Sequence, residues 1–271
     1  MGVAAVKLAN HMDSYDEKLK REKDWYNQTG DHGRFQKKHF LNSRLFYSPE
    51  RVAYSTRVFK EQLAGRIREV LEQDHLSNPR LLLAPTGAGH ELPYLLPLSQ
   101  RIAGIDISSS ALEAIPDSAM EKHLGDIKHM SMFEDGRFDV VIMSEFFHHF
   151  VKFGFDEFLL EARRVLRPGG HLFASEPSIL HPFAAAAWCG KRLFGNITGC
   201  VEDESPFCPV RLTAAMRRCG FREVSLEAAS YSHHRMPIPF ARIIHVVTRP
   251  LLKAPLFPHL AWDCIFHARK P

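Results

Sequence analysis

Cysteines are few in this sequence of 271 residues, and no two of them form a Cys-x-x-Cys pair. The five are scattered and odd in number: Cys189, Cys200, Cys208, Cys219 and Cys264. Such a set indicates reduced thiols in a cytoplasmic protein rather than a disulfide framework or a zinc site. The histidines likewise show no recognisable metal-ligand spacing, so no metal is expected.

Long apolar runs and strong net charge are also absent. No stretch approaches the roughly 18 uncharged apolar residues of a membrane-spanning helix. The briefly apolar N-terminus soon becomes heavily charged, unlike a secretion signal. The formal net charge is only +4, and it does not resemble the concentrated basic surface of a nucleic-acid-binding protein. Because 45% of the residues are apolar, the chain can bury a sizeable core, and we expect a cytoplasmic globular protein with no nucleic-acid partner.

The chain does contain a regular alternation of strand and helix patterns from residue 80 onward. Short apolar segments predict strands at 80–84, 101–108, 122–126, 137–146, 171–177, 222–229 and 261–271. Helical patterns fall at 49–73, 90–100, 108–117, 155–170 and 209–220. This alternation favours an α/β fold with a mostly parallel sheet covered on both faces. Such sheets bind ligands beyond the carboxyl ends of their strands, so the residues that follow each strand are the candidate site.

Three segments precede or interrupt this alternation and divide the chain into parts. Residues 1–50 are polar, basic and aromatic, and are expected to form an N-terminal lid or substrate segment, unless their rings pack on the core. The core covers 51–271, with insertions at 178–208 and 234–260, the first of which is expected to cap a substrate. The second is apolar with interspersed arginines. We expect it to be a buried helix, a homodimer surface, or a patch that meets lipid-linked material, in that order of preference.

A glycine motif, Gly87-Ala88-Gly89, follows the first predicted strand directly. Glycines at this position let the backbone approach a ligand closely. The start of the following helix offers unpaired N–H groups to an anionic ligand. By itself, the motif is equally consistent with an ordinary turn.

Two aspartates at the ends of the next strands strengthen the ligand interpretation. Asp106, followed by Ile107, ends the second strand, where a carboxylate can accept both hydroxyls of a ribose. Alternatively, it caps the next helix. Asp126 ends the third strand at a position suited to an adenine amino group, with Ile127 packing on the base. Alternatively, it is a turn aspartate. Suitable residues at three successive strand ends favour a nucleoside-binding site.

With these residues, the chain resembles the class I S-adenosylmethionine-dependent methyltransferases, of the small-molecule type related to ubiquinone-biosynthesis methyltransferases. The resemblance covers 52–177 and 209–271, and its most specific parts are "GIDIS", "GD" at 125–126, "FDVVIMSEFFHHF" and "EARRVLRPGGHLFASEP". It implies S-adenosyl-L-methionine as cofactor, and a Rossmann-like, doubly wound, seven-stranded sheet with an antiparallel last strand. The implied cofactor-binding residues are Pro85, Thr86, Gly87, Gly89, Asp106, Ile107, Asp126, Ile127, Ser144 and Glu145.

The loop after the first strand departs from the family pattern. Leu83 and Pro85 stand where family members usually have an acidic residue and a first glycine. That acidic side chain commonly helps to hold the amino group of the cofactor's methionine part. Proline removes a backbone donor and fixes one dihedral angle, but Thr86 and both glycines remain. We therefore expect a modified but working loop, with Glu91 or Glu145 supplying the missing charge from another direction.

The candidate catalytic residues are His148, His149 and Glu176. Methyl transfer is a displacement that depends on alignment, and a hydroxyl acceptor also benefits from a base. The paired histidines follow the fourth strand, where the family's acceptor pocket opens. In an extended segment they would face opposite ways, so at most one would act as the base, oriented by Glu176. Alternatively, the histidines pack and cap the next helix, and Glu176 is a solvated loop carboxylate.

The sequence thus predicts methyl transfer to a hydroxyl or amine of a small molecule, such as a sugar or specialised metabolite. The alternative is a non-catalytic regulator that binds the cofactor or its demethylated product, S-adenosylhomocysteine. A nicotinamide-dependent oxidoreductase is disfavoured because Leu92 stands near the position of a third glycine.

Overall fold

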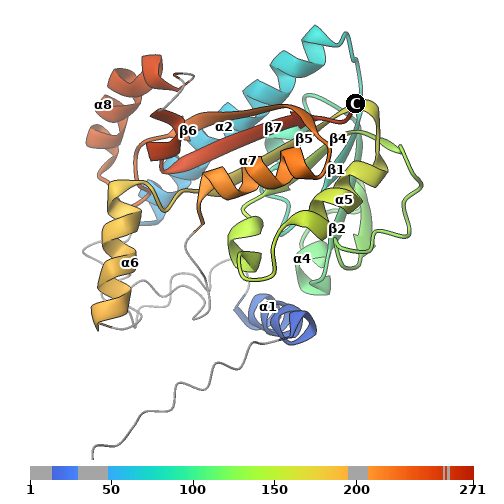
Figure 1. Cartoon of the computed structure of the whole chain (residues 1–271), viewed down its shortest axis with the longest axis horizontal. Helices are drawn as coiled ribbons and strands as arrows, with labels where there is room; N and C mark the ends of the chain where they lie inside the picture. Colours follow the sequence, from blue (N-terminus) through green and yellow to red (C-terminus); the bar gives the residue numbers. More distant parts are fainter. Residues whose placement is uncertain (1–13, 30–47, 195–206, 253, 255–256) are drawn as a thin grey trace, which may run out of the picture.

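A sheet of seven strands forms the centre of the molecule (Figure 1). The computed structural model describes residues 14–29, 48–194, 207–252, 254 and 257–271. The strands follow one another across the sheet in the order β3 (Glu121–Leu124), β2 (Arg101–Asp106), β1 (Arg80–Leu83), β4 (Phe138–Ser144), β5 (Leu166–Pro177), β7 (Asp263–Arg269) and β6 (Arg222–Ser230). Neighbouring strands are parallel except that β7 runs antiparallel to both β5 and β6. The predicted Rossmann-like, doubly wound sheet with an antiparallel last strand is confirmed.

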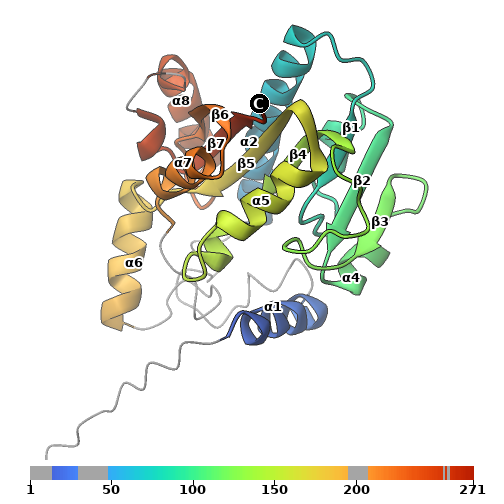
Figure 2. The same ribbon diagram turned by 45° about the vertical axis from the view of Figure 1, so that its right-hand side comes forward.

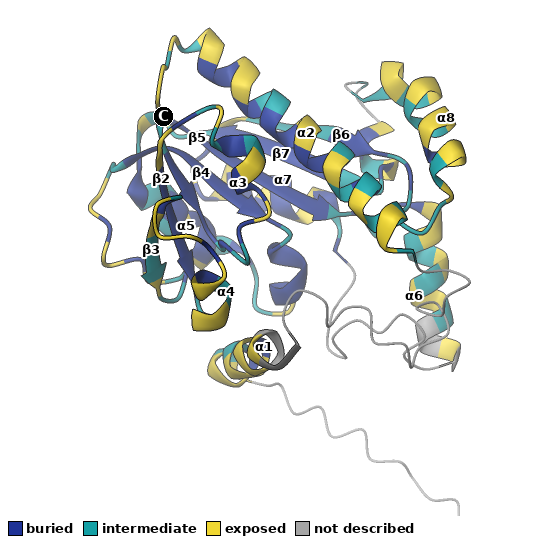
Figure 3. Cartoon of the chain, turned by 180° about the vertical axis from the view of Figure 1, so that it is seen from behind, coloured by how far each residue is buried: buried dark blue, intermediate teal, exposed yellow. Residues whose placement is uncertain are grey.

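Helices cover both faces of this sheet, because alternate strand residues point to opposite faces. On one face, Leu82 packs in a core with side chains of α5 (Asp156–Val165) and α7 (Pro209–Arg218). On the other, Leu81 and Leu83 pack with side chains of α2 (Pro49–Gln73) and the short α3 (Leu92–Leu95). Figure 1 shows the first face, and Figure 3 shows the second from behind, with its strands almost entirely buried.

Helix α2 begins and packs as its sequence predicts. The Ser48 side chain accepts a hydrogen bond from the backbone N–H of Arg51, and Pro49 occupies the first turn. The buried stripe of α2 includes Phe59, Leu63 and Ile67, spaced four residues apart. The predicted helix at 108–117 shrinks to α4 (Ser109–Glu113), for which Ser108 is the N-cap.

One predicted boundary is wrong. The helix expected over 155–170 ends at Val165, and Pro168-Gly169-Gly170 lies inside β5 instead of terminating the helix. Leu166 already has an extended backbone and pairs with Phe138, so the strand starts there. The register then shifts between Phe138 and Val140, which leaves the intervening residues of β5 in a bulge.

Both insertions contribute a helix, α6 (Pro182–Phe194) and α8 (Ile238–Thr248), with η4 (Arg249–Leu251) and η5 (Phe257–Leu260) following α8. Figures 1 and 2 show α6 and α8 at the same end of the molecule. The first preference for the second insertion, a buried helix, is wrong, since Ala241 is the only residue of α8 that is buried. Residues 195–206, including Cys200, lie outside the described part.

The N-terminal segment is described only at α1 (Tyr15–Thr29), which contacts α4 (Figure 2). Residues 1–13 and 30–47 of the expected lid lie outside the described residues. Across the described ranges, no helix has the length and apolar character to span a bilayer.

Candidate functional site

The glycine loop leaves β1 and is fastened to β2. The backbone N–H of Thr86 donates to the Ile105 carbonyl (3.0 Å), and its hydroxyl donates to the same oxygen (3.2 Å). Gly87 and Gly89 both have positive φ, 53° and 75°. A Cβ on Gly87 would meet nothing within 4 Å, whereas one on Gly89 would come within 2.8 Å of Leu92. Gly87 is therefore the residue whose backbone faces open space, and Gly89 is needed for packing.

Asp106 links this loop to the end of β2. Its carboxylate accepts the N–H of Gly87 at 2.8 Å and the N–H of Ser108 at 2.8 Å. Burial raises the pKa of Asp106, which is only 6% exposed. The N-cap of α4 is the Ser108 side chain, which accepts from Ala111, so Asp106 is not the helix cap considered as its alternative role. Ile107 lies between these two residues.

Asp126, after β3, accepts hydrogen bonds from the Tyr15 hydroxyl (2.8 Å) and the Lys128 N–H (2.9 Å). Burial, and then the Asp126 carboxylate, raise the pKa of Tyr15. Ile127 is buried in the core between the sheet and α5. Near the other end of α1, Ser108 donates to the Asn27 side chain at 2.8 Å. Helix α1 is thus attached to the loops that follow both β2 and β3.

Side chains that follow β4 and that end β5 form a buried polar chain. The Glu176 carboxylate, fully buried, lies 2.7 Å from Nδ1 of His148 and accepts the N–H groups of Phe146 (2.7 Å) and Phe147 (2.6 Å). Nδ1 of His149 lies 3.3 Å from the Glu22 carboxylate of α1, which also pairs with Lys18. Burial would raise the pKa of Glu22, but His149 and Lys18 lower it to about 2. Glu176 is therefore not a solvated carboxylate, and the chain connects β5 to α1.

The expectation that the two histidines face opposite ways is wrong. Residues Phe147–Phe150 form a 3-10 helix, η3, rather than an extended segment. Both histidine residues are 8% exposed, and their ring centroids lie 4.1 Å apart. The tight turn is stabilised by the N–H groups that Glu176 accepts, so one carboxylate both shapes η3 and contacts His148.

Ser144 is the last residue of β4 and Glu145 follows it, and their side chains lie in different environments. The Ser144 hydroxyl lies 2.8 Å from that of Ser175 and is buried within the sheet. Glu145 has a φ of 50° and a side chain that is 40% exposed. Lys60, buried on α2, forms an ion pair with Glu91 and lies 3.8 Å from Glu145. Burial would lower the pKa of Lys60, but these two carboxylates outweigh it and the pKa is raised.

Asp263 lies close enough to Glu145 and Lys60 to interact with their charges. Burial raises its pKa well above the usual value, and the nearby Glu145 carboxylate adds to the effect. Sequence reasoning missed Asp263, Lys60, Tyr15 and Glu22. One signal for Asp263 was available, because the first residue of an antiparallel strand lies at the carboxyl edge of its parallel neighbours. A lysine next to the apolar stripe of α2 was a signal for Lys60.

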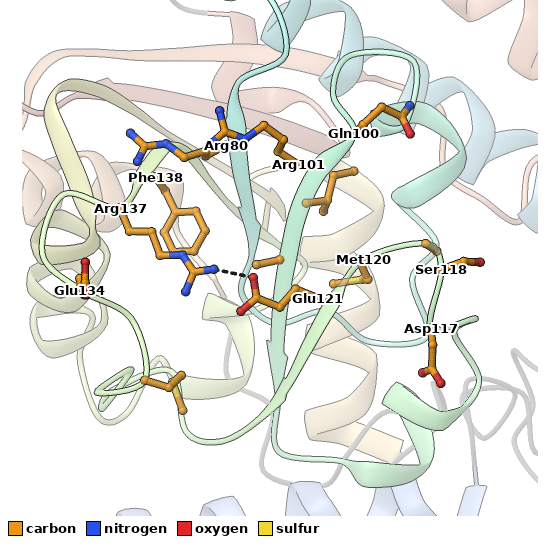
Figure 4. Close-up of a pocket in the computed structure, with 14 residues that line it drawn as sticks. Arg80, Gln100, Arg101, Asp117, Ser118, Met120, Glu121, Glu134, Arg137 and Phe138 are labelled. Atoms are coloured by element: carbon orange, nitrogen blue, oxygen red, sulfur yellow. Dashed lines mark hydrogen bonds and ion pairs between the residues drawn. The ribbon is translucent and has the colours of Figure 1, made fainter.

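A shallow polar hollow lies at the opposite edge of the sheet (Figure 4). Its lining includes the first residues of four strands, Arg80, Arg101, Glu121 and Phe138. Figure 4 shows the Arg137 guanidinium pointing toward the Glu121 carboxylate, with which it pairs. The hollow is therefore separate from the polar residues at the carboxyl ends of the strands.

Residues 83–174, which contain the glycine loop, Asp106, Asp126 and the paired histidines, match the family described as "Methyltransferase domain". They form a class I S-adenosylmethionine-dependent methyltransferase domain. The resemblance noted in the sequence and the predicted S-adenosyl-L-methionine cofactor are thereby confirmed. No curated protein sequence matches the chain.

Solved structures share the fold of this methyltransferase domain at low sequence identity. An S-adenosylmethionine-dependent methyltransferase from Thermotoga maritima, described as a "possible histamine N-methyltransferase", has a TM-score of 0.56 at 16% identity and covers 82% of this chain and 94% of its own. Magnesium protoporphyrin IX methyltransferase from Synechocystis, with bound S-adenosylmethionine, has a TM-score of 0.56 at 13% sequence identity. The match covers 94% of this chain and 97% of that structure. The [4+2]-cyclase SpnF has a TM-score of 0.52 at 20% sequence identity, and the match covers 78% of this chain and 81% of that structure.

Proposed function

We propose that this enzyme methylates a hydroxyl, or an amine, of a small molecule such as a sugar or specialised metabolite, with His148 as the base. The contact that carries the proposal is the 2.7 Å approach of the buried Glu176 carboxylate to Nδ1 of His148. A carboxylate on one ring nitrogen holds the proton there and fixes the ring orientation, so the other nitrogen, Nε2, carries the lone pair. The pair therefore has the chemistry of a positioned general base.

The chain's own residues have separable tasks in this proposal. When bound, S-adenosylmethionine supplies an electrophilic methyl group on a sulfonium. His148 would take the proton of the acceptor hydroxyl at Nε2 as the oxygen bonds to the methyl carbon, while the bond between that carbon and sulfur breaks and S-adenosylhomocysteine is the leaving group. Glu176 stabilises the resulting imidazolium and is a positioning residue. His149, paired with Glu22, is assigned to holding α1 across the site rather than to proton transfer.

The residues after β1, β2 and β3 fit the adenosine part of the cofactor. The backbone at Gly87 borders open space, and the Asp106 carboxylate, which accepts the Gly87 N–H, lies beside it. We assign Asp106 to the ribose hydroxyls, with Pro85, Thr86, Gly89 and Ile107 shaping the loop. We assign Asp126 to the adenine amino group of the cofactor, and Ile127 to packing against the adenine ring.

Glu145 is better suited than Glu91 to replace the acidic residue missing at Leu83. Glu91 is 8% exposed and paired with Lys60, so its charge is already neutralised within the protein. Glu145 is 40% exposed and 3.8 Å from the same lysine, so it retains an accessible carboxylate. We assign Glu145 to the amino group of the methionine part, and Ser144 to supporting the end of β4.

Helix α1 is assigned the role of a lid over the bound cofactor. It contacts Asp126 through Tyr15, Ser108 through Asn27 and His149 through Glu22. These three contacts reach the loops after β2, β3 and β4, which together surround the assigned adenosine and acceptor positions.

The test combines binding with transfer. Calorimetric titration with S-adenosylmethionine, S-adenosylhomocysteine and NADH should show binding of the two sulfur compounds only. Incubation with methyl-labelled S-adenosylmethionine and a small-molecule extract should then label an acceptor, stable to mild acid if it is an ether. Binding of both sulfur compounds without any labelled product would instead support the regulator.

A further inference from the structure

Helix α8 carries its apolar side chains on the outside of the molecule. Val246 is 74% exposed and Val247 67%, and Phe240 and Ile243 are exposed to a similar degree. A surface helix normally turns such a stripe toward the core. Figure 3 shows α8 largely exposed along its length.

Polar contacts from a single histidine attach α8 to the core, in addition to the buried Ala241. Nδ1 of His245 lies 3.1 Å from the Tyr54 hydroxyl of α2, and Nε2 lies 2.6 Å from the hydroxyl of Ser232, which follows β6. Burial lowers the pKa of His245, which favours the neutral ring. The inward face of α8 is thus held by a neutral histidine while its outward face is apolar.

The neighbouring helix α6 presents the same kind of surface. Leu193 and Phe183 are 75% and 59% exposed. The start of α6 is tied to the segment before α8 by ring contacts: the centroid of Phe183 lies 6.3 Å from that of His233, which lies 4.1 Å from Trp262. Figures 1, 2 and 3 agree in placing both helices at one end of the molecule.

The charged residues within α6, α8 and η4 are all basic, and the acidic residues Glu202, Asp203 and Glu204 of the first insertion lie outside the described residues. The chain has 31 acidic residues, yet none occurs in 177–201 or in 228–262, the stretches that contain α6 and α8. Arg242 and Arg249 are exposed on α8 and η4. Exposed apolar side chains on helices whose charged residues are all basic complement an anionic lipid surface. A second copy of the same surface would instead bring arginines against arginines, which disfavours a symmetric dimer.

We propose that the outer faces of α6 and α8 form a docking surface for an anionic lipid bilayer, defined by Phe183, Leu193, Phe240, Ile243, Val246 and Val247. The surface holds the protein at the interface without crossing the bilayer. Helix α6 follows β5 and α8 follows β6, so both leave the sheet near the edge that carries Glu176 and Asp263. Docking therefore places the acceptor edge of the enzyme next to the lipid surface.

Vesicle co-sedimentation of the full-length protein tests the proposal. We expect binding to vesicles of equal parts phosphatidylglycerol and phosphatidylcholine, and at least tenfold weaker binding to phosphatidylcholine alone. The double variant Phe240→Ser/Val246→Ser should bind the anionic vesicles at least tenfold more weakly than the unmodified protein. The matched control is Leu160→Ser/Val210→Ser on α5 and α7, whose side chains are 52% and 51% exposed and which should bind as the unmodified protein does.

Three results would overturn the proposal. The first is no binding of the unmodified protein to the anionic vesicles. The second is an equal loss of vesicle binding in the α8 variant and in the control variant, with circular dichroism showing that both are folded. The third is a dimer, detected by sedimentation equilibrium, that Phe240→Ser/Val246→Ser dissociates while vesicle binding is absent. That result would assign the surface to self-association.

Discussion

The two halves of the sheet's carboxyl edge are constructed differently. After β1 and β2, Asp106 receives N–H groups from Gly87 and Ser108, all within one strand–helix–strand unit. After β4 and β5, the contacts join distant elements, since Glu176 meets His148 and His149 meets Glu22 of α1. The first half is held mainly by backbone N–H groups close in the fold, with one side-chain contact from Asn27 of α1 to Ser108, and the second mainly by long-range pairs of side chains. The first should therefore govern cofactor affinity, and the second transfer and lid closure.

His148→Gln should have the largest effect. Removing a positioned base costs about a hundredfold to ten-thousandfold in rate, so labelled methyl transfer should fall by roughly a thousandfold. Affinity for S-adenosylmethionine should be unchanged, because the residue lies in the second half. Glu176→Gln should lower the rate less and shift its pH profile, and His234→Gln serves as control. Equal loss of rate and affinity in His148→Gln would mean that the two halves are not separable.

Asp106→Ala should lower affinity for S-adenosylmethionine by about a hundredfold. Hydrogen bonds to a charged group contribute about 1.5–3 kcal/mol each, and the Gly87 N–H also loses its acceptor. Titration calorimetry measures the change, with the conservative variant Asp106→Asn expected to retain part of the affinity. Unchanged affinity in Asp106→Ala would remove the ribose assignment.

Acid should destabilise the fold through two histidines, His233 after β6 and His267 on β7. Burial lowers the pKa of His233 and of His267 to about 3 from the ordinary 6.5. Unfolded, each ring gains a proton below pH 6.5, whereas the folded ring stays neutral down to about pH 3. Their contribution is complete above pH 6.5 and is lost toward pH 3, at about 1.4 kcal/mol per pH unit for each histidine.

Urea unfolding at several pH values between these limits checks the acid prediction. His267→Phe keeps a ring against Phe173 and should reduce the slope of unfolding free energy with pH. A slope unaffected by His267→Phe would show that His267 is not among the groups that destabilise the fold in acid.

Glu22→Gln should have the smallest effect, confined to α1. The amide keeps the shape of the side chain but loses its charge opposite Lys18 and His149. Amide hydrogens of α1 should exchange about fivefold faster, for a net loss of about 1 kcal/mol. Those of β4 should be unchanged, as should all rates in the exposed control Asp24→Asn on the same helix. Faster exchange in β4 as well would mean that α1 belongs to the core and is not a lid.

The sequence by itself determined the sheet and the residues at its strand ends. The glycine loop, Asp106 and Asp126 are each defined by the strand that precedes them, so periodicity and local motifs were sufficient. Such patterns did not define the helix end at Val165, because the pairing of Leu166 with Phe138 draws the following residues into β5. Extended geometry was wrong at His148 and His149, because the Glu176 carboxylate, distant in sequence, stabilises a tight turn there.

Only the tertiary structure decided which charges meet and which way α8 faces. Lys60, Glu145 and Asp263 come from three separate elements, and no spacing along the chain predicts their proximity. The apolar residues of α8 predict a buried stripe, but in the structure His245 faces inward, where it contacts Tyr54 and Ser232. Local backbone preference acts over a few residues and is written in the sequence, whereas burial and pairing depend on which distant elements the fold brings together.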